Sequence, residues 1–351
     1  MLRYLTAGEA HGPALIGIMD GFPAGVPIDK DYIARSLARR RTAPGRSRRQ
    51  ALETDAFYVS CGLYKNVTTG APIAVMLKNI SQFAVLDPSS VPRPGHADLA
   101  GMLKYGISAS SVIRERASAR ETAVRTALGA FCLRLLELLD IRITSRVIKL
   151  GHLRSEDPKT IRRELEQAEK AGRSLGGIFE VRAEELPVGL GSHAQWDRRL
   201  PSRLAAQLMG LNGVKGAEFG SGFELAAMRG EEALDLFKKG GPLKRLTNLA
   251  GGLEGGMTNG MPLVLRAAVR PVPGQGSPVR SIDLKTGRTA EAAPGRSDIT
   301  AVFAAAVIAE HLVAFELADA LLEKFGGDSL KEIKARVVAW RAQTAKYQRG
   351  K

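Results

Sequence analysis

The segment from residue 93 to residue 130, RPGHADLAGMLKYGISASSVIRERASARETAVRTALGA, places the strongest constraint on how this chain can fold. Ser118 followed three residues later by Glu121 is the pattern of a capping box at a helix N-terminus. Apolar residues then recur every four positions from Ala127 to Leu135. We therefore expect a helix that begins near Ser118 and buries an apolar face.

Cationic and titratable side chains surround the start of this predicted helix. His96 lies in a turn upstream, between Arg93 and Asp98. Free backbone N–H groups at a helix N-terminus attract anions, and guanidinium groups on the same side would strengthen that attraction. A solvated helix start would more often carry Asp or Glu, so the pattern favours an anion site over a plain surface. The clustered arginines are Arg114, Arg116, Arg120 and Arg125.

The net charge of +15 and the pI near 10 point to anionic partners, which include nucleic acid, an acidic membrane and small phosphorylated substrates. Charge alone does not choose among these. Cys61 and Cys132 stand in apolar-looking sequence without a CxxC motif, which is typical of a reduced cytoplasmic protein. We expect no secretory leader at the start and no membrane span in residues 301–322, where charged residues interrupt the apolar run.

Alternating and helical patterns follow one another along the whole chain without a linker. Five glycines within residues 251–260 argue against regular structure there. With 44% apolar residues the chain can bury a large core, and we expect one α+β domain over residues 1–351 with mainly antiparallel sheets and a short flexible tail from about residue 343. The expected strands are 13–21, 53–64, 71–79, 141–151, 176–189 and 261–274, and further helices should start near residues 29, 157, 300 and 329.

Several catalytic signatures are absent from the sequence, including the P-loop, the dinucleotide-binding glycine motif and the zinc-protease motif. The five histidines show no metal-ligand spacing. His11 lies in the glycine-flanked turn GEAHG, and an Arg296-Ser297-Asp298 turn follows much later. Two turn histidines, clustered arginines and this turn together describe a site for a multiply anionic molecule with acid and base groups inside.

These blocks, taken in order, resemble the chorismate synthase family over residues 2 to about 330. The matching segments are GEAHG, RPGHAD with Lys104-Tyr105-Gly106, SARET, GSHAQWDRRL, GGLEGGMTNG, Arg296-Ser297-Asp298 and FGGDS. The resemblance implies a lyase that converts 5-enolpyruvylshikimate 3-phosphate to chorismate, the last step of the shikimate pathway. It also implies central helices sandwiched between two mainly antiparallel sheets.

The reaction of this family is an anti 1,4-elimination of phosphate and a ring proton, and it needs reduced FMN without net redox change. In the family's mechanism the flavin donates electron density as phosphate leaves and recovers it as the proton is lost. The resemblance makes His11 the proton donor toward the departing phosphate and His96 the histidine that serves the reduced flavin. Asp298 corresponds to the carboxylate that removes the ring proton.

The resemblance also assigns binding residues, and planar guanidinium groups suit phosphate and carboxylates better than Lys. The substrate-binding positions are Arg40, Arg46, Arg93, Ser118, Arg120 and Arg296. The flavin-binding positions are Arg116, Ala117, Ser118, Asn212, Gly213, Gly255, Arg270, Pro271, Val272, Pro273, Gly274 and Arg296.

Three positions depart from the usual family pattern. Ala10 replaces a serine, the basic loop reads APGRS from Ala43 to Ser47, and Gly274 replaces a threonine in the flavin turn. We expect weaker FMN binding from the loss of the threonine hydroxyl. The resemblance further implies a cytoplasmic homotetramer. The sequence leaves two sources of reduced FMN open, reduction by the protein itself with NADPH or supply by a separate flavin reductase or another source, and a chain without long insertions favours the second.

Two other functions compete with this interpretation. The arginine clusters would suit a nucleic-acid-binding protein, but aromatic residues make up only 5% of the chain and the basic runs lack the interleaved rings that stack on bases. A catalytically dead family member that serves as a scaffold is the second alternative. The retained histidines, aspartate and arginines argue against it.

Overall fold

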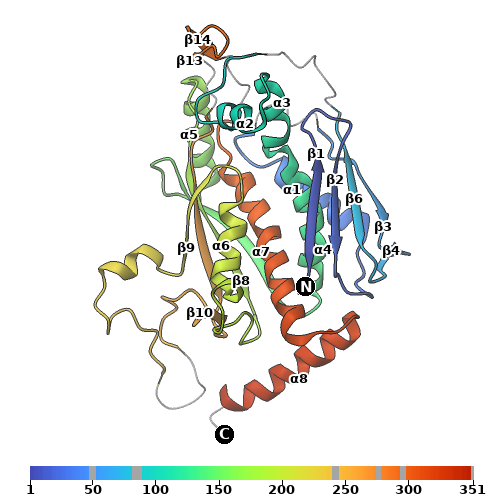
Figure 1. Cartoon of the computed structure of the whole chain (residues 1–351). Coiled ribbons are helices and arrows are strands. Elements are labelled where there is room, and N and C mark those ends of the chain that lie inside the picture. The colour runs from blue at the N-terminus through green and yellow to red at the C-terminus, as the bar shows by residue number, and fades with distance from the viewer. Residues whose placement is uncertain (47–52, 81–88, 239–244, 274–277, 293–297, 349–351) are drawn as a thin grey trace.

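The computed structural model describes residues 1–46, 53–80, 89–238, 245–273, 278–292 and 298–348. Two four-stranded antiparallel sheets enclose the long helices α4 and α7, as Figure 1 shows. Buried side chains from both sheets and from the helices between them form one continuous apolar cluster. The predicted α+β sandwich is therefore confirmed.

The first sheet contains the N-terminal strands, and one of its faces packs on α4. Along β2, Leu15 and Met19 are fully buried, whereas Ile16 and Ile18 between them point outward. This alternation places the buried residues against the helix layer. In spatial order the strands are β1 (Arg3–Gly8), β2 (Ala14–Asp20), β6 (Ile73–Lys78) and β3 (Phe57–Cys61).

The second sheet covers the opposite side of the helices, and its strands β7 and β8 pack on α7. Alternate residues of its central strand β12, from Leu263 to Val269, are buried. In spatial order the strands are β7 (Arg142–Leu150), β8 (Gly177–Glu184), β12 (Leu263–Val269) and β9 (Val214–Phe219). Three hairpins lie outside both sheets: β4 (Leu63–Tyr64) with β5 (Val67–Thr68), β10 (Leu253–Glu254) with β11 (Met257–Thr258), and β13 (Val279–Ile282) with β14 (Thr289–Ala292).

The helices begin where local capping signals place them. The Asp29 carboxylate accepts from the backbone N–H of Tyr32, and the Asp157 carboxylate accepts from those of Lys159 and Thr160. The helices are α1 (Lys30–Arg41), α2 (Asp98–Tyr105), α3 (Ser110–Ala117), α4 (Thr122–Glu137), α5 (Pro158–Lys170), α6 (Leu200–Met209), α7 (Val302–Phe325) and α8 (Leu330–Gln348). Short 3-10 turns are η2 (Ala119–Glu121), η3 (Trp196–Arg198) and η4 (Gly222–Ala227).

Helices α4 and α7 approach closely at Gly129. A Cβ atom at this position would lie 2.5 Å from the Cβ of His311 and 2.7 Å from its carbonyl oxygen. Only hydrogen fits in that space, so this glycine sets the spacing of the two central helices.

The predicted helix start near Ser118 is confirmed in position, but its first turn is the 3-10 turn η2 rather than α-helix. The chain is already helical in α3, breaks at Ser118 and becomes α-helical again only at Thr122. The Ser118 hydroxyl accepts from the N–H of Arg120 at 3.3 Å, and Glu121 lies near Thr6 and Arg125 rather than completing a capping box. The sequence pattern identified a real cap, but of a short 3-10 turn between two helices.

Three smaller expectations also need correction. The chain stays helical to Gln348, well past residue 343, and α8 is anchored near its middle because the Trp340 indole N–H donates to the Val188 carbonyl at 3.1 Å. The glycine-rich segment contains the short hairpin β10–β11. Both cysteines were expected in apolar surroundings, but Cys61 is exposed and only Cys132 is buried.

Within the described residues, no helix has both the length and the apolar character needed to cross a membrane.

Candidate active site

The C-terminal end of α3 and the turn after it form the centre of the candidate site, at the top of the sandwich in Figure 1. The turn between β1 and β2, which carries His11, lies against this segment. His11 Nδ1 lies 2.8 Å from Oε1 of Glu115, and the His11 backbone N–H donates to Oε2 at 2.7 Å. The N–H of Ala10 donates to the Glu115 carbonyl at 3.1 Å. Glu115 was not among the residues predicted from the sequence.

A buried ion cluster lies behind this turn. Arg120 donates to one carboxylate oxygen of Asp55, and Arg40 donates to the other at 3.3 Å. Arg120 also lies 3.4 Å from Glu53, and Arg40 donates to the hydroxyl of Thr122 at 3.2 Å. Burial lowers the pKa of Arg40 to about 9, so the guanidinium stays charged at neutral pH. The two arginines that we expected to meet substrate therefore have carboxylate partners inside the protein.

Asn79 joins the histidine turn to this ion cluster. Its side-chain N–H groups donate to the carbonyls of Glu9 and Gly12, at 2.9 and 2.8 Å. Its oxygen accepts from Arg120 Nε at 3.1 Å. The amide thus bridges the backbone on both sides of His11 to the buried arginine.

Asp298 and Arg46 come together although 252 positions separate them in sequence. Arg46 donates to the Asp298 carboxylate at 2.5 Å, and both side chains are nearly buried. The adjoining backbones are joined as well, because the N–H of Ile299 donates to the Gly45 carbonyl at 2.8 Å. The charges of both Arg46 and Asp298 act on Arg40, which places this pair beside the buried ion cluster. Arg296 and Ser47 lie outside the described residues.

His96 lies in the turn before α2, and Asp98, the first residue of that helix, holds Arg93. Arg93 donates to both carboxylate oxygens of Asp98, at 2.9 and 3.1 Å. Burial tends to raise the pKa of Asp98, but these hydrogen bonds outweigh burial and lower it. Burial and the Arg93 charge together lower the pKa of His96 below its usual value. His96 is therefore mainly neutral at pH 7 and able to accept a proton.

Hydrogen bonds connect most of the predicted flavin segments to one another. The Asn212 side chain donates to the Ala117 carbonyl at 3.1 Å, and the Arg270 N–H donates to the Gly213 carbonyl at 2.9 Å. Arg270 Nη2 donates to the Gly95 carbonyl at 2.5 Å, next to His96. Four chain segments that are far apart in sequence therefore meet at the turn that carries His96: those around residues 95, 117, 212 and 270.

The remaining residues of these flavin segments are also held in place. Arg116 donates to the carbonyls of Thr6 and Gly8, at 2.9 and 3.3 Å. Pro273 packs on Gly95, and the Val272 carbonyl accepts from Ser174 at 2.8 Å, while Pro271 continues the same turn. Gly274 lies outside the described residues.

One buried nitrogen suits a bound anion or flavin. Arg270 Nε has no hydrogen-bond partner among the described residues. A buried unpaired guanidinium nitrogen is costly, and a polar ligand group would satisfy it. The Arg270 segment therefore fits a polar cofactor.

Gly255 does not join this group. It lies in the β10–β11 turn, where the Gly256 carbonyl accepts from Leu200, the first residue of α6. Asn212 follows the other end of the same ten-residue helix, which spans about 15 Å. The structure thus places Gly255 at the opposite end of α6 from the other predicted flavin residues.

The residues that sequence analysis missed are those that pair with predicted ones: Glu53, Asp55, Asn79 and Glu115. Glu115 stands among the arginines of the 93–130 segment, so its charge was the one available signal. Asp55 has a positive φ of 52°, which no local pattern indicated. Within the described part of the chain, no group of three or more His, Cys, Asp or Glu side chains could hold a metal ion.

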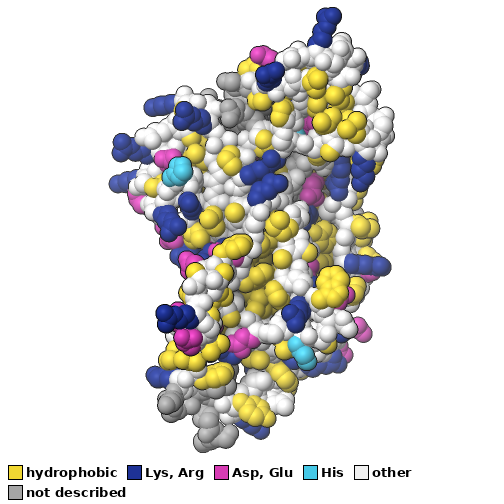
Figure 2. Space-filling view, turned by 60° about the vertical axis from the view of Figure 1, so that its left-hand side comes forward, with side chains coloured by type: hydrophobic (Ala, Val, Ile, Leu, Met, Phe, Trp, Pro, Cys, Tyr) yellow, Lys and Arg dark blue, Asp and Glu magenta, His cyan; other side chains and the backbone are white. Residues whose placement is uncertain are grey.

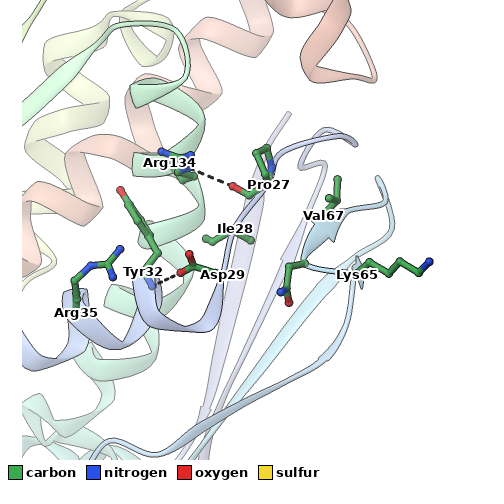
Figure 3. A pocket seen from close by; sticks show the side chains of 9 residues that line it. Pro27, Ile28, Asp29, Tyr32, Arg35, Lys65, Val67 and Arg134 are labelled. Atoms are coloured by element: carbon green, nitrogen blue, oxygen red, sulfur yellow. Dashed lines mark hydrogen bonds between the residues drawn. The ribbon is translucent and has the colours of Figure 1, made fainter.

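A cavity of about 300 Å³ lies elsewhere, between the start of α1 and the β4–β5 hairpin. Figure 3 shows Tyr32 between Arg35 and Arg134, and Arg134 donates to the Pro27 carbonyl at 3.2 Å. None of its lining residues belongs to the predicted site.

The face seen in Figure 2 carries Lys and Arg side chains interspersed with Asp and Glu rather than a continuous basic stripe. This distribution of charge does not favour nucleic-acid binding on that face.

Comparisons with known proteins identify the family of this chain. Residues 2–322 match the family described as chorismate synthase. Chorismate synthase of Caldanaerobacter subterraneus subsp. tengcongensis is 46% identical, over 95% of this chain and 96% of that protein. The protein of that name from Desulforamulus reducens is 44% identical, over 97% and 98%. A chorismate synthase crystal structure superposes with a TM-score of 0.80 at 33% identity, covering 99% of both chains. This chain belongs to the chorismate synthase family.

Proposed function

We propose that this chain forms chorismate from 5-enolpyruvylshikimate 3-phosphate at the cluster that contains His11, His96 and Asp298. The observation that carries the proposal is the chain of contacts from the His11 turn through Asn79 and Arg120 to Asp55 and Arg40. The Arg46–Asp298 pair adjoins this chain of contacts. These contacts support a single site for acid, base and anion-binding groups, as a 1,4-elimination of phosphate requires.

Each titratable group then has a distinct task. His11 gives a proton to the departing phosphate, because its ring is fixed by Glu115 and its turn lies next to Arg120 through Asn79. Asp298 removes the ring proton. Arg46 exchanges its contact with Asp298 for one with the anionic substrate, which leaves the carboxylate available as a base.

The fit of Arg270 to a polar ligand supports reduced FMN as the cofactor. Ala117, Asn212, Gly213 and the turn from Arg270 to Pro273 would hold it. When bound, reduced FMN would supply electron density to the substrate as phosphate leaves, without net redox change. His96, neutral at pH 7 and adjacent to Arg270, is the residue that would exchange a proton beside this segment.

We further propose a cytoplasmic homotetramer that receives reduced flavin from a separate reductase. The outer face of the first sheet supports self-association, because Leu5, Ile16 and Ile18 are 79%, 41% and 47% exposed on adjoining strands. Such a contiguous apolar face is typical of an interface. With NADPH as the only reductant, we expect no chorismate.

The proposal is tested by an anaerobic assay with dithionite-reduced FMN and the phosphorylated enolpyruvyl substrate, following chorismate absorbance. We expect turnover from the wild-type chain, and a loss of at least about 100-fold in kcat for His11→Gln and for Asp298→Asn. Wild-type activity in either variant would remove that residue from its assigned role. Flavin titration of a Gly274→Thr variant beside the wild type tests whether the natural glycine weakens FMN binding, and equal affinities would reject that idea.

A further inference from the structure

The Glu115 carboxylate makes two different contacts to one residue. Oε2 accepts the backbone N–H of His11 at 2.7 Å, whereas Oε1 lies 2.8 Å from the imidazole Nδ1. The Glu115 side chain is 9% exposed and the His11 side chain 32%. The contact to the ring is therefore largely shielded from water on the carboxylate side, and the ring is open on another.

An ionised carboxylate only accepts hydrogen bonds, so the Nδ1 atom that faces Glu115 must carry the proton. The neutral imidazole is then restricted to one tautomer, and Nε2 becomes the nitrogen that exchanges protons with a ligand. A carboxylate behind a histidine also stabilises the imidazolium form. Both effects favour a histidine that acts as a proton donor.

The contact to the ring can be separated from the anchoring of the turn. The N–H of Ala10 donates to the Glu115 backbone carbonyl, and Asn79 donates to the carbonyls of Glu9 and Gly12. None of these three bonds involves the Glu115 carboxylate. The turn is therefore held on both sides of His11 even when the carboxylate is changed.

Other charged groups surround the histidine turn. Arg116 of α3 donates to the Gly8 carbonyl, Arg120 contacts the turn through Asn79, and the exposed Glu9 lies within the turn itself. Among the contacts described here, Glu115 alone joins a carboxylate directly to the His11 ring. Glu9 thus offers a matched control, as a carboxylate of the same turn.

We propose that Glu115 is a positioning residue for this reaction: it fixes the tautomer of His11 and stabilises its protonated form, so that Nε2 can give a proton to the departing phosphate. This inference rests on the proposed function, in which His11 is that acid. In this role Glu115 acts through the His11 ring rather than on the substrate.

The test compares Glu115→Gln, Glu115→Asp and Glu9→Gln in the anaerobic assay across pH. A glutamine keeps the size of the side chain but removes its charge, so kcat should fall about 10- to 100-fold with little change in KM. Without the Glu115 charge the His11 imidazolium is less stabilised and gives up its proton more readily, so the alkaline limb of the kcat profile should move to lower pH. Glu115→Asp should restore part of this shift, and Glu9→Gln should leave the limb in place.

A second measurement does not depend on turnover. NMR of the ¹⁵N-labelled histidines in the flavin-free protein, with the His11 signal assigned through His11→Gln, reports the tautomer and the titration of that ring. We expect protonated Nδ1 in the wild type and a lower titration midpoint in Glu115→Gln. An unchanged tautomer and midpoint would overturn the inference, as would an unshifted limb in a folded Glu115→Gln variant. Full activity of His11→Gln would instead refute the acid role of His11, so the two failures are distinguishable.

Discussion

Replacing Asp55 by Asn should destabilise the protein strongly, because one buried carboxylate serves two buried guanidinium groups. Asp55 is 3% exposed, and its two oxygens meet Arg120 and Arg40, which are 7% and 1% exposed. Asn has nearly the same shape and tolerates the positive φ of 52° at this position, so the substitution removes charge without adding backbone strain. Breaking a buried ion pair from one side costs about 3–5 kcal/mol.

For a chain of 351 residues, this cost corresponds to a melting temperature lower by roughly 4–7 °C. Thermal unfolding followed by circular dichroism, without ligands, measures it. Glu53→Gln is the comparison, because Glu53 is also buried but lies 3.4 Å from Arg120, and its replacement leaves Asp55 in place. A glutamine oxygen can still accept from the Ile80 N–H, so the loss should be smaller than for Asp55→Asn. Saturating phosphorylated substrate should narrow the gap between Asp55→Asn and wild type by supplying negative charge. Equal melting temperatures for wild type and Asp55→Asn would refute the reasoning.

Three further perturbations test other parts of the molecule. Gly129→Ala should cost about 1–3 kcal/mol or more in urea unfolding, because its Cβ would lie 2.5 Å from the Cβ of His311, and an unchanged midpoint would contradict the close helix approach. Burial lowers the pKa of His311, so the folded state keeps this ring neutral while the unfolded chain binds a proton below about pH 6.5. Stability should therefore be lost as pH falls from 7.5 to 5.5, and His311→Gln should flatten that dependence; equal slopes would reject the argument. Ile16→Glu should lower the molar mass measured by light scattering, whereas the matched change Val338→Glu on α8 should not; an unchanged mass for Ile16→Glu would exclude the outer sheet face as an interface.

The elements that could be predicted from the sequence are those fixed by local signals. Strand β2 follows from the alternation of buried and outward residues, and α5 begins at an Asp-Pro pair whose carboxylate caps it. The start of the central helix near Ser118 was predicted, but the 3-10 form of its first turn was not, and the reason is local too. The same Ser118 hydroxyl can cap a 3-10 turn or an α-helix, and the sequence pattern does not distinguish the two.

The candidate site was only half predictable, because sequence patterns identified its arginines and histidines but missed Asp55, Asn79 and Glu115, which hold several of them in place. Asp55 and Arg120 are 65 positions apart, and Asn79 joins backbone that lies 67 and 70 positions away. Such contacts depend on how the first sheet packs on α4, which no local pattern records. Residues with positive φ, such as Asp55, are equally hidden in a sequence.

The buried ion cluster of the candidate site contributes little to the excess positive charge of the chain. Arg40, Arg46 and Arg120 are matched there by carboxylates from Glu53, Asp55 and Asp298, so these six side chains are close to electrically balanced. Net charge was therefore a poor guide to the site, since a basic surface and a balanced interior are independent. What identifies the site is the burial of guanidinium groups together with carboxylates, because charges are removed from water only where hydrogen bonds and opposite charges offset the cost. A multiply anionic substrate must then compete with carboxylates already in place. Asp298 is the most exposed of these carboxylates, and its pair with Arg46 lies beside the buried ion cluster rather than at its centre. The contact between Arg46 and Asp298 is therefore the one that an anionic substrate can most readily replace.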